Sequence, residues 1–116
     1  MEFQEKRLFK RLKIHLPVTF RALTAQRYSE ETTTKDISST GLRMNLDVFF
    51  PPETPFSIKV HFPEINKIIE GMAKIVWCQR ISLAEQYQAG LRFYDINPVF
   101  KNWLEEYILI DENHAA

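Results

Sequence analysis

The sequence contains a single cysteine, Cys78, among 116 residues. One thiol cannot form an internal disulfide, which excludes a secreted scaffold held together by disulfides. The sequence also lacks a charged-then-apolar leader and any apolar run of about 18 residues, so we expect a cytoplasmic protein without a membrane-spanning segment. Lys plus Arg equals Asp plus Glu at 15 each. That balance argues against the basic surface expected of a protein that binds double-stranded nucleic acid.

Catalytic and metal-binding patterns are missing as well. No nucleophile elbow, zinc-protease or phosphate-loop motif occurs. His15, His61 and His114 are far apart in sequence and have no ligand spacing with Cys78. Zinc sites need such spacing, so no metal site is expected. We therefore predict a protein that is not an enzyme and that uses no cofactor.

What the sequence does contain is a series of apolar–polar alternations. Hydrophobic residues make up 45% of the chain, enough for the core of one globular domain. Period-two patterns and β-branched residues predict strands over 15–23, 32–38, 41–49, 56–62, 65–81 and 87–96. The long segment 65–81 is expected to bend at Gly71. Residues 24–31 and 51–55 are expected to be connections.

The periodicity changes at Asn97. Asn97 is a suitable N-cap and Pro98 suits the first helical turn, which predicts a helix over 97–110. Its expected apolar face consists of Val99, Trp103, Leu104, Tyr107 and Ile108. Several short strands followed by one helix favour a small antiparallel β-barrel with the helix packed over it or over one of its ends.

Two polar motifs stand out from this framework. Residues 1–14 are rich in Lys and Arg, and Arg7 and Arg11 lie four positions apart. A solvated helix face and a local anion site both explain that spacing. The second motif is "KDISSTG" (35–41), in which Asp36, Ser38 and Gly41 form D-x-S-x-x-G between two predicted strands. Alone, it is best interpreted as a hairpin turn.

The chain carries a series of motifs in a fixed order: R-x-x-x-R (7–11), D-x-S-x-x-G (36–41), "GMAKIVW" (71–77), "YQAGLRF" (87–93) and a final helix. This ordered set resembles the PilZ domain family, whose members bind the bacterial second messenger cyclic di-GMP. The resemblance covers nearly the whole chain. It implies a six-stranded antiparallel barrel with a C-terminal helix, ligand binding without catalysis and a bacterial cytoplasmic setting. The chain then divides into a ligand-clamping N-terminal arm (1–14) and a barrel with its helix (15–116).

By this resemblance the binding site comprises Arg7, Arg11, Asp36, Ser38 and Gly41. The chemistry is consistent, because a guanidinium can pair with guanine N7 and O6 or with phosphate oxygens. Asp36 can accept hydrogen bonds from guanine N1 and N2. Ser38 supplies a hydroxyl, and Gly41 allows close approach of the backbone.

Two further cations are weaker candidates for the site. Lys6 is expected to contact a phosphate. It stands where many family members carry a second Arg, a difference that bears on whether one ligand or an intercalated pair binds. Arg43 follows the second motif by two residues, but an exposed strand arginine is the favoured interpretation.

The resulting hypothesis is a cyclic di-GMP receptor, monomeric or homodimeric, whose arm and surface change on binding to regulate an unidentified partner protein. One alternative is a PilZ-like module of pilus or flagellar machinery that binds only protein. Another is a small-barrel binder of single-stranded nucleic acid, which would need a basic groove lined by aromatic residues. The zero net charge argues against nucleic acid.

Overall fold

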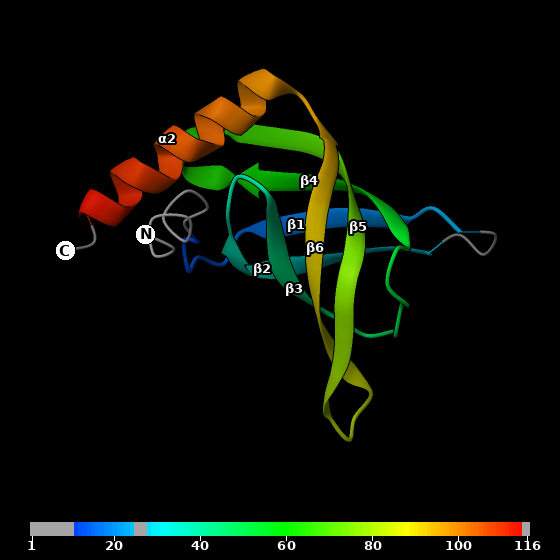
Figure 1. Cartoon of the computed structure of the whole chain (residues 1–116). Coiled ribbons are helices and arrows are strands. Elements are labelled where there is room, and N and C mark those ends of the chain that lie inside the picture. Colours follow the sequence, from blue (N-terminus) through cyan, green and yellow to red (C-terminus); the bar gives the residue numbers. More distant parts are fainter. Residues whose placement is uncertain (1–10, 25–27, 115–116) are drawn as a thin grey trace, which may run out of the picture.

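The computed structural model describes residues 11–24 and 28–114, with side chains as far as residue 110. Six strands and one long helix make up this part of the chain (Figure 1). The elements are β1 (Pro17–Ala22), β2 (Tyr28–Ile37), β3 (Gly41–Leu46), β4 (Pro55–Phe62), the 3-10 turn η1 (Pro63–Ile65), β5 (Lys67–Ser82), β6 (Gln86–Ile96) and α2 (Pro98–His114).

The strands close into an antiparallel barrel in the order β1-β2-β3-β6-β5-β4. Consecutive strands pair within β1–β2–β3 and within β4–β5–β6. The β3–β6 and β1–β4 pairs join these two meanders. The structure thus confirms the predicted six-stranded antiparallel barrel with a C-terminal helix.

The barrel interior is filled by the alternating apolar positions. Along β4 every second side chain, from Phe56 to Phe62, is buried. The Phe56 ring stacks on Phe20 of β1 at 5.3 Å and meets Phe50 edge-on at 5.0 Å. Aromatic pairs in these geometries add to the stabilisation from apolar burial. The predicted alternation in β1 and β4 is therefore the alternation between core and surface.

Two strand boundaries were predicted wrongly. Tyr28–Glu31, expected in a connection, belongs to β2 and pairs along β1 in the register Ala22↔Tyr28 and Phe20↔Glu30. The composition of this segment is typical of a loop, but its pairing with β1 makes it a strand. In the β2–β3 hairpin, β3 ends at Leu46. Val48, which the predicted alternation placed on the buried face, is exposed.

The β5–β6 hairpin is long, bent and irregular, and it reaches past the side of the barrel (Figure 1). Its register shifts between Met72 and Ala73, next to the predicted bend at Gly71. Farther along, a Cβ on Gly90 would lie 2.4 Å from the indole nitrogen of Trp77. The absence of a side chain at Gly90 therefore makes room for the Trp77 indole.

Helix α2 lies across one end of the barrel (Figure 1). Asn97 caps it, because its Oδ1 accepts a hydrogen bond from the Val99 amide at 2.9 Å. The Trp103 and Tyr107 rings each meet Phe62 at 5.0 Å. Among the described residues, no helix is both long and apolar enough to cross a bilayer.

The predicted helix face and end were partly wrong. Val99 is 69% exposed, and Phe100 packs against the core instead. The apolar face therefore follows the i, i+3, i+4, i+7, i+8 pattern from Phe100, with Leu104 and Ile108 buried. The helix also continues to His114, beyond the predicted end near residue 110.

Candidate ligand-binding site

The segment before β1 is attached to the end of β2. Leu12 and Ile37 exchange two backbone hydrogen bonds of 2.8 and 3.0 Å, and the Leu12 side chain is buried. The Thr34 hydroxyl continues this attachment by accepting from the Leu16 amide at 2.9 Å and donating to the Ile14 carbonyl. Residues 11–16 are thereby held beside β2, and Arg11 is placed next to the "KDISSTG" turn.

Asp36 is the centre of an ion-pair cluster. Its Oδ1 accepts a hydrogen bond from Arg11 Nη1 at 2.8 Å. Its Oδ2 accepts from Arg43 Nε at 2.6 Å and lies 2.5 Å from Arg43 Nη2. The Asp36 side chain is only 3% exposed, whereas Arg11 is 50% and Arg43 is 36% exposed. A buried carboxylate requires such compensation, and here both of its oxygens are occupied.

The geometry of the turn explains why Arg43 meets Asp36. The Ser38 amide donates to the Gly41 carbonyl at 2.8 Å, so the hairpin is centred between these residues. Counting outward from the centre places Asp36 directly opposite Arg43, and the two are cross-strand partners in β2 and β3. Side chains opposite each other on one face of a sheet are close enough to interact.

Ser38 is buried inside its own turn. Its Oγ accepts a hydrogen bond from the Thr40 amide at 3.2 Å and lies 3.0 Å from the Thr40 hydroxyl. The Thr40 carbonyl in turn accepts from the Phe93 amide of β6 at 2.8 Å. The motif serine thus stabilises the turn, and the turn is fastened to the neighbouring strand.

Gly41 is required by strand packing. A Cβ at this position would lie 2.0 Å from the Leu91 carbonyl oxygen and 3.1 Å from the Arg92 Cα. Gly41 has no positive φ, so close approach of backbone is the reason for glycine here. The approaching backbone in this structure is that of β6.

Three of the predicted site residues, Arg11, Asp36 and Arg43, form one cluster, and Ser38 and Gly41 form the adjoining turn. Arg7 and Lys6 lie outside the described residues. The preference for Arg43 as an exposed strand arginine was wrong, since it is half-buried and paired. Its position opposite Asp36 could have been found by counting outward from the turn.

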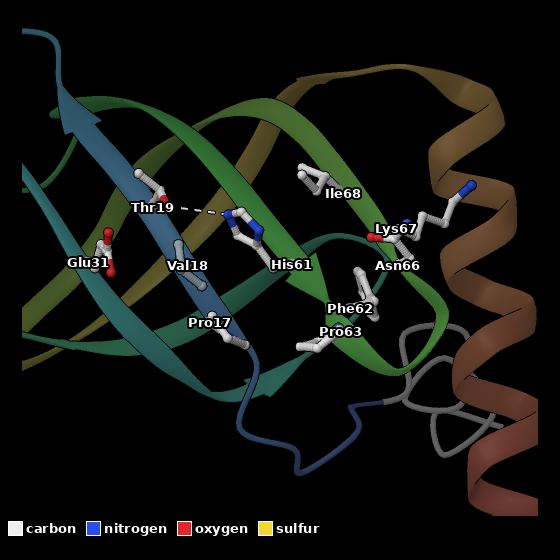
Figure 2. A pocket seen from close by; sticks show the side chains of 10 residues that line it. All are labelled: Pro17, Val18, Thr19, Glu31, His61, Phe62, Pro63, Asn66, Lys67 and Ile68. Carbon is white, nitrogen blue, oxygen red and sulfur yellow. Dashed lines mark hydrogen bonds between the residues drawn. The ribbon is translucent and has the colours of Figure 1, made fainter.

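A separate groove lies on the outside of the barrel between β1, β4 and η1 (Figure 2). Its volume is about 330 Å³. His61 lines it and hydrogen-bonds the Thr19 hydroxyl at 3.3 Å, and Lys67 lies 4.8 Å from the Trp103 ring centre. None of the Asp36 cluster lines this groove. Within residues 11–24 and 28–110 no group of three His, Cys, Asp or Glu side chains could hold a metal ion.

The described part of the chain is thus a small closed β-barrel with an arginine–carboxylate cluster beside a hairpin turn. The PilZ domain profile matches residues 5–109, so the chain belongs to the PilZ domain family. Family membership agrees with the predicted class, a ligand-binding protein that is neither an enzyme nor dependent on a cofactor. Among curated proteins none matches the sequence significantly.

Solved structures with the same fold include MotI/DgrA, the Bacillus subtilis inhibitor of motility, with a TM-score of 0.76 and 17% identity over 91% of this chain and 51% of that one. The PilZ domain of Escherichia coli YcgR with c-di-GMP has a TM-score of 0.67 and 17% identity, with 92% of each chain covered. Borreliella burgdorferi PlzA in complex with c-di-GMP has a TM-score of 0.56 and 15% identity over 99% of this chain and 56% of PlzA. The chain spans about half the length of MotI and PlzA.

Proposed function

We propose that this protein is a receptor for cyclic di-GMP. The observation that carries the proposal is the contact between its two motifs: Arg11 of R-x-x-x-R binds Asp36 of D-x-S-x-x-G, 25 residues away in sequence. Family membership and the c-di-GMP complexes of two proteins with this fold support the same ligand.

The chemistry of the cluster suits an anionic purine ligand. Arg11 is half exposed and uses one Nη for Asp36, so further guanidinium donors can meet a phosphate or the guanine N7 and O6 acceptors. Arg7 is proposed to supply a second guanidinium and Lys6 a phosphate contact. Asp36 would accept from guanine N1 and N2, with Ser38 and Gly41 contributing at the turn.

Ligand binding would require a rearrangement at Asp36. Both carboxylate oxygens contact arginines and the Asp36 side chain is only 3% exposed, so we expect guanine to reach Asp36 by displacing one arginine. Arg11 is the more exposed of the two and directly precedes Leu12, which is bridged to Ile37. We propose that this movement of Arg11 is how ligand binding alters the N-terminal arm and the protein surface.

We propose that this change regulates a partner protein in the cytoplasm. The far end of the β5–β6 hairpin offers one surface for such contact, because Leu83 is 96% exposed and Ile81 is exposed beside it.

A second candidate function is a PilZ-like module that binds only protein. The observation that favours it is the same cluster, because Asp36 is buried and both of its carboxylate oxygens contact arginines of the chain itself. An ion-pair network that is complete by itself can serve a purely structural role.

Calorimetric titration of the full chain with cyclic di-GMP, with GTP and cyclic AMP as controls, separates the two functions. We expect cyclic di-GMP alone to bind. Arg7→Ala and Arg11→Ala should each weaken binding at least about tenfold, because a charge-assisted hydrogen bond contributes about 1.5 to 3 kcal/mol. Arg21→Ala is the matched control: Arg21 is an exposed strand arginine that pairs with Ser29 near the start of β2, away from Asp36.

Absence of heat and of any ligand-induced change at saturating cyclic di-GMP would favour the protein-binding module. Wild-type affinity in both arm variants would leave the receptor intact but would contradict the assignment of its site.

A further inference from the structure

The two cations on Asp36 are not equivalent. Arg43 places both Nε and Nη2 on Oδ2, at 2.6 and 2.5 Å. Arg11 makes a single contact, Nη1 to Oδ1 at 2.8 Å, and is half exposed. By number of contacts and by exposure, Arg43 is the more firmly held partner.

The backbone reinforces this difference. Arg43 lies inside β3, where it pairs with Asp36 on one side and with Gly90 of β6 on the other. Arg43 cannot leave Asp36 by backbone movement unless the barrel opens. Arg11 precedes all the strands, and the nearest backbone bonds are those of Leu12 to Ile37. Arg11 can therefore move while the barrel stays closed.

We infer that Arg43 is a fixed counter-ion that holds the Asp36 carboxylate in place, so that Arg11 can be exchanged for the ligand. This inference rests on the proposed cyclic di-GMP site and assigns Arg43 a positioning role, without contact to the ligand. A buried carboxylate that loses its only cation is strongly destabilised. With Arg43 present, Oδ2 keeps its contact with a cation. Oδ1 can then exchange its hydrogen bond from Arg11 for hydrogen bonds from guanine donors.

Removal of Arg43 should consequently weaken ligand binding indirectly. In Arg43→Ala the buried carboxylate would retain Arg11 as its only cation, and the ligand would have to compete with that pair. We expect an affinity loss of about tenfold. Arg43→Lys should recover part of it, because a lysine restores the charge but not the two-nitrogen contact.

A double-mutant cycle on cyclic di-GMP affinity tests this role. If Arg43 acts through Asp36, Arg43→Ala should have an effect of no more than about twofold in an Asp36→Ala background. The salt dependence of binding should also change less in Arg43→Ala than in Arg11→Ala, since Arg43 is the cation that does not touch a phosphate. Arg21→Ala again serves as the control. If Asp36→Ala does not fold, Asp36→Asn takes its place.

A tenfold loss that persists without the Asp36 carboxylate, together with a weaker salt dependence, would show that Arg43 contacts the ligand and would overturn the inference. If wild type does not bind cyclic di-GMP, the proposed function fails, and thermal unfolding tests the counter-ion separately. Arg43→Ala should then lower the Tm more than Arg11→Ala, and this difference should vanish without the Asp36 carboxylate. Equal losses would overturn the counter-ion role.

Discussion

The substitution Gly41→Ala should show whether the glycine of D-x-S-x-x-G serves the fold. The added Cβ would lie 2.0 Å from the Leu91 carbonyl oxygen, where a carbon–oxygen contact normally needs about 3.3 Å. The neighbouring atoms, Leu91 C and Arg92 Cα, are backbone as well. No side-chain rotation can relieve the overlap, so β3 and β6 would have to separate by roughly 1 Å.

The size of the effect follows from this separation. Overpacking in a rigid site destabilises by about 1 to 3 kcal/mol. Weakening one or two of the neighbouring β3–β6 bonds, such as the one from the Phe93 amide to the Thr40 carbonyl, adds about 1 kcal/mol each. We therefore expect a loss of roughly 2 to 5 kcal/mol out of a total of about 5 to 15 kcal/mol. For a domain of this size the Tm should fall by on the order of 10 to 20 °C.

Thermal unfolding followed by circular dichroism measures this loss, and Gly71→Ala is the matched control. A Cβ on Gly71 would meet the Asp95 carbonyl oxygen at 3.1 Å, an overlap of only a few tenths of an ångström. The control should lose about 1 kcal/mol or less, because alanine also reduces the backbone entropy lost on folding. A Gly41→Ala protein that unfolds with the Tm of wild type but no longer binds cyclic di-GMP would refute the packing argument and assign the glycine to the ligand.

Two further measurements test the arm and the outer end of β2. Cyclic di-GMP should raise amide protection before Leu12 and over residues 36–41, while protection in the strands from 55 to 94 stays unchanged. Leu12 and Ile37 are already hydrogen-bonded to each other. Unchanged exchange before Leu12 would contradict the proposed change of the arm on ligand binding. A hydrogen bond to Glu30, assisted by burial, raises the pKa of Tyr28 from 10.0 to about 12. The folded state thus binds this proton more tightly, so its stabilisation is complete below pH 10.0 and is lost as the pH rises toward about 12. The urea midpoint of Tyr28→Phe should decrease less than that of wild type over this pH range. An equal decrease in the two proteins would contradict this reasoning.

Local patterns predicted most of the fold. The alternation from Phe56 to Phe62 identified a half-buried strand because the side-chain period of a strand is two, whatever its partners. The Asn97 cap was predicted because it depends on contacts within one helical turn. The prediction failed where contacts with a neighbouring element decide the local structure. Tyr28–Glu31 forms a strand because it pairs with β1. Phe100 takes the place of Val99 on the buried helix face because of the way α2 packs on the end of the barrel.

The sequence by itself determined the class of the protein, because the motifs and their order are written along the chain. It also placed Arg11 and Asp36 in the candidate site. Only the tertiary structure decided how these residues are paired. The Asp36 carboxylate is buried and shared between Arg11 and Arg43, and Gly41 accommodates the Leu91 carbonyl. Such contacts join residues that are distant in sequence, and their strength depends on burial, which local periodicity does not specify.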